Sequence, residues 1–194
     1  TLHNTLFPYT TLFRSLVTAG ALVLLFLVIA VWAIPRTVSD LYISLAAGRD
    51  ICSGKLAVPD DWSFSTGGRV WINQNWGADL ILYAVHSSFG GAGLLAVKLL
   101  LLALIAFFMI LALRTRKIPL PIGILTAAIC IGALNVYAIL RPNLFTLTLI
   151  PLELWLLHMS RTRTRLVWLT VPLILLWANL HGGFLFGIGM LFLH

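Results

Sequence analysis

Long apolar runs with few charges constrain this chain more than any other feature of its sequence. Residues 16–34 carry no charged side chain and approach the ~20 residues that a helix needs to cross a bilayer core. Further apolar runs cover residues 93–113, 118–140, 144–159, 166–180 and 184–194. Because backbone polar groups in lipid must bond within their own segment, such runs form helices. The sequence therefore predicts an all-α fold, a polytopic transmembrane helical bundle of about five to six spans.

Composition and charge placement agree with this prediction. Hydrophobic residues make up 60% of the chain and charged residues 10%, whereas soluble domains carry about 25% charge. The net charge of +7 does not indicate nucleic-acid binding, because the basic residues cluster in two short tracts between apolar runs. Such tracts hold short loops in the cytoplasm. They consist of Arg114, Arg116 and Lys117, and of Arg161, Arg163 and Arg165.

The N-terminal residues resemble a foreign sequence. Thr5 to Ser15, TLFPYTTLFRS, matches the translation of a common sequencing-library adapter. We therefore expect residues 1–15 to be artefactual and exclude them from fold reasoning. We also expect the chain to be part of a longer protein, because His194 lies within an apolar run.

A polar island separates the first two predicted spans. Residues 36–92 form this loop, which holds all the acidic residues except Glu153. Residues 40–53 and 76–89 are predicted as interfacial helices, ended by Gly54 and by Gly90-Gly91. Pro59, Gly67 and Gly68 break the segment between them.

The basic tracts also predict which segments share one side of the membrane. If both tracts are cytoplasmic, the island, residues 141–143 and residues 179–183 all lie outside. Three segments that are far apart in the sequence therefore meet at one face.

Each polar group on that face has more than one interpretation. Asp40 is predicted either as a general base or metal ligand, or as the N-cap of the helix starting at Leu41. Arg141 is suited to a phosphate-bearing lipid or to a snorkelling role at the interface, with Asn143 beside it. Asn179 and His181 line either a cavity or a tight turn.

The roles of the remaining candidate residues are predicted from their neighbours in the sequence. Glu153 is interpreted either as a functional carboxylate within the membrane or as a structural partner of Lys98, since each lies in an apolar run. Trp62, Trp71 and Trp76 fit an interfacial belt or a sugar-binding platform. Cys52 and Cys130 show neither a disulfide framework nor metal-ligand spacing, so no particular metal is predicted.

Five short strings follow one another along the island and the later turns: DLYISLAAGRDI at 40–51, PDDWSFS at 59–65, WINQNW at 71–76, RPNLF at 141–145 and WANLHGG at 177–183. In this order they resemble a bacterial family of polytopic proteins similar to the GT-C superfamily of membrane glycosyltransferases. The chain departs from the family pattern at Val38, where an acidic residue is common, and at residues 42–44.

The resemblance implies a bacterial inner-membrane enzyme that takes a sugar from a polyprenyl-phosphate donor, with the island facing the periplasm or exterior. Asp40 would be catalytic, Arg141 and His181 would hold phosphate, and a divalent metal is conceivable as a cofactor. The alternative is a non-enzymatic membrane protein, such as a lipid-linked-saccharide transporter or a complex subunit.

Overall fold

The computed structural model describes residues 8–34, 38–59, 62, 65, 68–134 and 137–194. Within these residues the fold is all-helical, 79% helix with no strands, as the sequence predicts. In chain order the α-helices are α1 (Pro8–Ala33), α2 (Ser39–Cys52), α3 (Trp76–Thr115), α4 (Leu120–Ala133), α5 (Asn143–Ser160), α6 (Thr170–Leu180) and α7 (Phe184–Phe192). A 3₁₀ helix, η3 (Thr164–Leu169), leads directly into α6.

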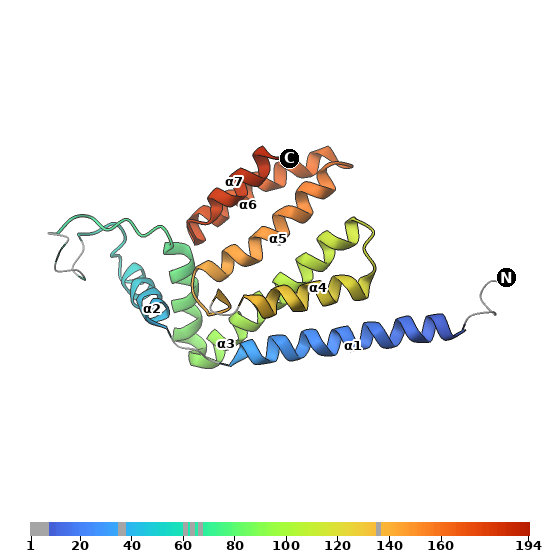
Figure 1. The fold of residues 1–194 in the computed structure, drawn as a ribbon. Helices are drawn as coiled ribbons and strands as arrows, with labels where there is room; N and C mark the ends of the chain where they lie inside the picture. Colours follow the sequence, from blue (N-terminus) through green and yellow to red (C-terminus); the bar gives the residue numbers. More distant parts are fainter. Residues whose placement is uncertain (1–7, 35–37, 60–61, 63–64, 66–67, 135–136) are drawn as a thin grey trace.

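The central element is α3, which packs against α1, α2, α4, α5 and α6. The buried core lies along it and includes Leu82, Leu102, Ile131, Leu144 and Trp177. Figure 1 shows α2 and the loop after it at one end of the bundle, together with the start of α5 and the connection from α6 to α7. The turns that carry the two basic tracts lie at the opposite end.

A sharp corner divides α3 into two parts. Gly90 has φ 61° and ψ −150°, a conformation that is essentially confined to glycine. The first part, residues 76–89, packs against α2 at the polar end, and the second part runs along the bundle (Figure 1). This corner matches the predicted boundary between an interfacial helix and a membrane span.

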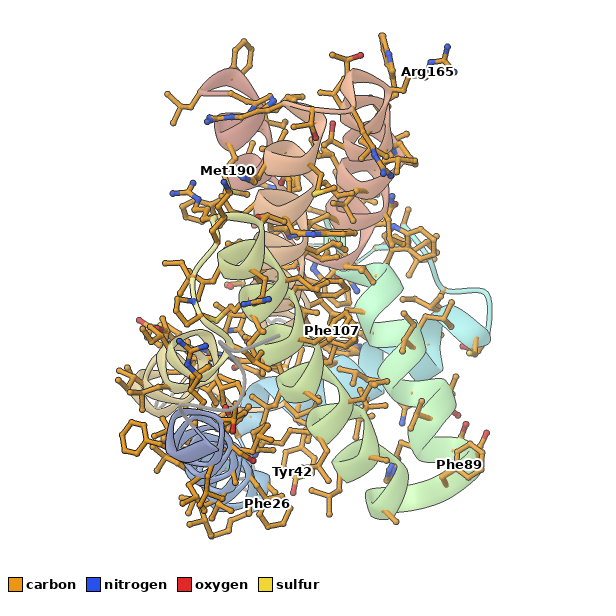
Figure 2. The ribbon with its side chains drawn as sticks, turned by 90° about the vertical axis from the view of Figure 1, so that its right-hand side faces the viewer. Phe26, Tyr42, Phe89, Phe107, Arg165 and Met190 are labelled. Atoms are coloured by element: carbon orange, nitrogen blue, oxygen red, sulfur yellow. The ribbon has the colours of Figure 1, made fainter. Side chains whose placement is uncertain are left out.

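Two described helices are long and apolar enough to cross a membrane, at Thr11–Ala33 and Trp76–Thr115. Their length and composition support membrane association. Large apolar side chains also face outward. Phe26 on α1 is 70% exposed and Phe89 on α3 is 71% exposed. Figure 2, which looks along the bundle, shows both on its outside.

Several expected boundaries differ from the observed ones. The helix expected over 118–140 ends at Ala133, and residues 138–140 are buried without being α-helical. Hydropathy cannot distinguish a buried irregular segment from a buried helix, because both are apolar. The run expected from Leu166 begins at Thr164 as a 3₁₀ helix, and α1 begins at Pro8, within the adapter-like residues.

Candidate functional site

An open hollow of about 430 Å³ lies at the polar end of the bundle. Its walls come from α2, from the segment before α3, from the first turn of α3 and from the residues before α5 and after α6. The lining residues are Asp40, Ile43, Ser44, Trp71, Asn73, Asn75, Asp79, Tyr137, Arg141, Pro142, Asn143 and His181. The hollow thus brings together Asp40, Arg141, Asn143, His181 and Trp71 from the sequence-predicted residues.

Asp40 and Arg141 form an ion pair across the hollow. Arg141 Nη1 lies 3.1 Å from Asp40 Oδ2, and Arg141 Nε donates a hydrogen bond of 2.9 Å to Asn143 Oδ1. The interpretation of Asp40 as an N-cap was wrong, because α2 already begins at Ser39 and has no side-chain cap. Asp40 therefore lies in the first helical turn, where a negative charge is favoured by the helix dipole.

A chain of hydrogen bonds fixes the ring of His181. Trp177 Nε1 donates to Thr146 Oγ1 over 2.7 Å, and Thr146 Oγ1 lies 2.9 Å from His181 Nδ1. The backbone N–H of Gly183 also donates to His181 Nδ1, over 3.0 Å. Because Nδ1 accepts the Gly183 bond, this pattern assigns the ring proton to Nε2.

The surroundings of His181 favour its neutral form. Burial lowers the pKa of the imidazole, and the nearby Arg141 charge lowers it further. His181 lines the hollow, where its lowered pKa favours the neutral imidazole over the cation. The tight turn and the cavity-lining role, posed as alternatives from the sequence, occur together: the same ring bonds Gly183 and lines the hollow.

Asp79 is a second carboxylate of the hollow, and sequence reasoning did not select it. It is only 4% exposed, and Asn73 Nδ2 donates to its Oδ2 over 2.8 Å. Among the described residues, Asp79 Oδ1 and Asn75 Oδ1 are buried without a hydrogen-bond partner. Asp79 lies in the first turn of α3. An acidic residue in the first turn of a largely apolar helix is the signal that could have identified it.

Trp76 and Asn179, both predicted to bind substrate, do not line the hollow. Trp76 Nε1 donates to Asn179 Oδ1 over 2.9 Å and so joins the start of α3 to the end of α6. Gly77 permits this approach, because a Cβ there would lie 2.7 Å from the carbonyl oxygen of Asn179. Their bond joins the helix ends next to two lining residues, Asn75 and His181.

The expected pairing of Glu153 with Lys98 was wrong. Lys98 Nζ donates to the carbonyl oxygen of Ile34 over 3.3 Å, and both carboxylate oxygens of the fully buried Glu153 lack a hydrogen-bond partner in the described part of the chain. Glu153 instead faces α7, where a Cβ on Gly187 would lie 2.7 Å from its Oε2. The two side chains thus point to different neighbours, which sequence spacing cannot reveal.

The carboxylate and amide oxygens of the hollow also bear on metal binding. Asp79 Oδ1 and Asn75 Oδ1 are hard oxygen ligands of the kind that Mg²⁺ and Ca²⁺ prefer. No group of three or more His, Cys, Asp or Glu residues with metal-binding geometry occurs among the described residues. Cys52 and Cys130 are free thiols.

Comparisons with protein-family models, with curated proteins and with solved structures found no match. The functional argument therefore rests on the geometry of the hollow.

Proposed function

We propose that this chain is a multi-pass membrane protein of about five to six spans, with the hollow at the outer surface of a bacterial inner membrane. Two helices with the length and composition of membrane spans support this proposal, as do the outward-facing apolar side chains. The basic tracts lie at the end of the bundle away from the hollow (Figure 1). By the positive-inside rule, that end would face the cytoplasm.

We further propose that the hollow is the active site of a GT-C-like glycosyltransferase that uses a polyprenyl-phosphate-linked sugar. The observation that carries this proposal is the ion pair between Asp40 and Arg141, residues that are distant in sequence but meet on the wall of one hollow. A carboxylate and a guanidinium placed together provide a proton acceptor and a phosphate-binding fork at one site.

The proposed reaction requires no redox partner. The acceptor hydroxyl oxygen forms a bond to the anomeric carbon of the sugar, and the bond between that carbon and the phosphate oxygen breaks. The bonding electron pair leaves with the phosphate oxygen. Asp40 takes the proton of the attacking hydroxyl, so the charge gained by the phosphate is balanced by the proton held on the carboxylate.

Arg141 and His181 are proposed to hold the departing phosphate. The guanidinium has five N–H donors, of which Nη1 and Nε already bond Asp40 and Asn143. Its remaining donors and the His181 Nε2–H are available to phosphate oxygens. Fixed donors stabilise developing negative charge most strongly where water is scarce.

A second candidate function is supported by Glu153. An unpaired carboxyl group buried in an apolar bundle is typical of proton or ion pathways in transporters. Glu153 has this character among the described residues. The alternative is therefore a non-enzymatic carrier of a lipid-linked saccharide, in which the hollow binds the headgroup without breaking a bond.

The test is transfer of radiolabelled hexose from polyprenyl-phosphate hexose in membranes that contain the protein. We expect labelled product with the wild type and not with Arg141→Gln, which removes the cation but keeps a polar side chain. Headgroup binding without transfer by the wild type would instead favour the carrier. An absence of both would refute each candidate.

A further inference from the structure

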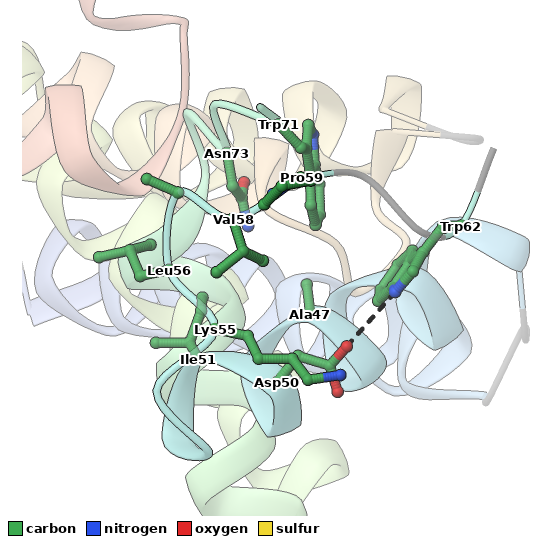
Figure 3. A pocket seen from close by; sticks show the side chains of 11 residues that line it. Ala47, Asp50, Ile51, Lys55, Leu56, Val58, Pro59, Trp62, Trp71 and Asn73 are labelled. Carbon is green, nitrogen blue, oxygen red and sulfur yellow. Dashed lines mark hydrogen bonds between the residues drawn. The ribbon is translucent and has the colours of Figure 1, made fainter. Parts of the chain in front are cut away.

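A recess of about 210 Å³ lies at the basic end of the bundle, away from the hollow. Its walls come from the turn after α3, from the last turns of α5 and from α7 and the residues that follow it. The space beside Trp62 and Trp71, shown in Figure 3, measures only about 20 Å³, which is room for about one water molecule. The basic recess, in contrast, has room for a phosphate group and the atoms attached to it.

One face of α5 gives the basic recess both an apolar wall and a polar rim. Leu154, Leu157 and Arg161 line the recess and are three and four residues apart, so they lie on one face of the helix. His158, which is half-buried, lies beside them four residues after Leu154. The lining of the recess therefore changes from leucine to imidazole and guanidinium toward the end of α5.

The other two walls are held in place by packing against α5. Both α3 and α7 contact α5, and Gly187 of α7 lies so close that a Cβ there would be 2.7 Å from Glu153 Oε2. Met190, one turn further along α7, lines the recess opposite the leucines, and Arg116 lines it from the end of α3. The recess is therefore formed by elements that already pack together.

Arg116 and Arg161 make the recess positively charged. Among the described residues neither guanidinium takes part in an ion pair, and no carboxylate lines the recess. Each arginine follows the last residue of its helix, where the helix dipole contributes about half a negative charge. Two full positive charges exceed that contribution, so an anion is attracted. Arg114, in contrast, lies outside the recess and donates to the carbonyl oxygen of Ile118 over 3.1 Å.

We propose that the basic recess binds the headgroup of an anionic glycerophospholipid. The phosphodiester accepts hydrogen bonds from the guanidinium forks of Arg116 and Arg161, and the glycerol and the first acyl carbons lie against Leu154 and Leu157. Basic pockets between membrane helices on the cytoplasmic side recognise anionic headgroups in this way. The leucine wall favours a lipid over free phosphate, which would leave that wall in water. This inference rests on the proposed membrane location and not on the proposed transfer reaction.

The test is native mass spectrometry of the full chain released from detergent micelles that contain added lipid. The probes are dioleoyl phosphatidylglycerol and dioleoyl phosphatidylcholine, which share their acyl chains and differ in headgroup charge. The choline ammonium would approach the two arginines and be repelled. We therefore expect phosphatidylglycerol to be retained at least about fivefold more than phosphatidylcholine.

Two variants and a matched control locate the bound lipid. Arg116→Gln and Arg161→Gln should each lower phosphatidylglycerol retention about fivefold, the usual contribution of one basic residue to binding an anionic lipid. Arg165→Gln should retain it as the wild type does, because Arg165 is an exposed arginine of η3 that lies outside the recess. Figure 2 shows Arg165 and Met190 toward the same end of the molecule. Melting temperatures verify that each variant is folded.

The inference is overturned if phosphatidylglycerol is not retained, if both lipids are retained equally, or if Arg165→Gln loses as much lipid as Arg161→Gln. Displacement of the lipid by inorganic phosphate at equal concentration would also overturn it, because a free anion would then suffice. The proposed function fails separately: hexose transfer depends on Arg141, and Arg141→Gln should leave phosphatidylglycerol retention unchanged. Lipid retention without hexose transfer would remove the glycosyltransferase and leave the lipid site standing.

Discussion

At the scale of single residues, the hollow contains two carboxylates in contrasting surroundings. The Asp40 side chain is 50% exposed and ion-paired, whereas Asp79 is buried and bonded through Oδ2 to a neutral amide. A proton acceptor must reach the attacking hydroxyl, and Asp40 lies on the wall beside Arg141. In the proposed reaction Asp40 would therefore take the proton, and Asp79 would position Asn73.

Exchanging each carboxylate for its amide separates these two roles. Asp40→Asn should lower the rate of hexose transfer by about 10²–10⁴-fold, the usual cost of removing a general base. Asp79→Asn should keep transfer within about tenfold of wild type, because the amide is isosteric and preserves an acceptor for Asn73. Transfer rates in membranes, normalised to protein content, provide the comparison. The reverse order of effects would make Asp79 the base.

The depressed pKa of His181 predicts a pH-dependent stability. Because its folded pKa lies below the ordinary 6.5, the unfolded state binds more protons once the pH falls below about 6.5. The stability contribution is thus fully present above that pH and is lost as pH falls toward the folded pKa. Melting temperatures in detergent at pH 7.5 and 5.5 should show a larger acid loss for wild type than for His181→Asn.

The choice of Asn makes this comparison specific. Its amide oxygen can accept the Thr146 and Gly183 bonds that Nδ1 accepts, and it does not titrate. His86→Gln, on an exposed part of α3, should retain the wild-type acid loss. If His181→Asn also retains it, the imidazole is not the group responsible.

At the scale of helices, sequence patterns predicted the elements that have clear end signals. Gly54 ends α2 with φ +85° and Gly90 forms the corner of α3, as the placement of glycines indicated. The end of α4 could not be predicted, because residues 138–140 are as apolar as the helix before them. The partners of Lys98 and Glu153 depend on helix rotation, which one sequence does not determine.

The contact between α3 and α6 predicts that Gly77 is intolerant of a methyl group. A Cβ at Gly77 would lie 2.7 Å from the Asn179 carbonyl oxygen, so Gly77→Ala should destabilise by about 1–3 kcal/mol. Gly91→Ala is the control on the same helix, since nothing lies within 4 Å of its Cβ position. It should be neutral or stabilise by up to about 1 kcal/mol. Thermal unfolding in detergent measures both, and equal effects would refute the close contact.

The buried carboxyl of Glu153 predicts an unusual gain in stability. Glu153→Leu removes two oxygens that lack partners among the described residues and should stabilise the fold by about 1–3 kcal/mol. The measurement is the melting temperature in detergent, with Leu152→Ala as a volume-reducing control that should lower it. A large fall in the melting temperature of Glu153→Leu would show that the carboxyl has a stabilising partner. A loss of transport without a fall in melting temperature would favour the carrier function.

At the scale of the whole molecule, the placement of the polar end was deducible from charge alone. The basic tracts predicted one face shared by residues 40, 141 and 181, and the structure brings these residues to one hollow. The depth of the hollow and the presence of Asp79 in it required coordinates, because they depend on the close packing of Gly48 in α2 against Asp79 and Tyr83. Such packing has no signature in hydropathy.

The proposed orientation in the membrane can be tested by labelling at both ends of the bundle. In a background with Cys52→Ser and Cys130→Ser, Ser65→Cys should react with a membrane-impermeant maleimide in intact spheroplasts. Thr162→Cys, which lies between the basic residues Arg161 and Arg163, should react only after permeabilisation. Both native positions are exposed in the structure. The opposite pattern would invert the orientation.

The charged groups of the hollow are divided between the two halves of the chain. Both carboxylates, Asp40 and Asp79, come from the first half, and the Arg141 guanidinium comes from the second half. Arg141 and Asp40 meet at 3.1 Å, so the charges that a bound molecule encounters exist only when the two halves are packed together. Neither half alone forms the hollow.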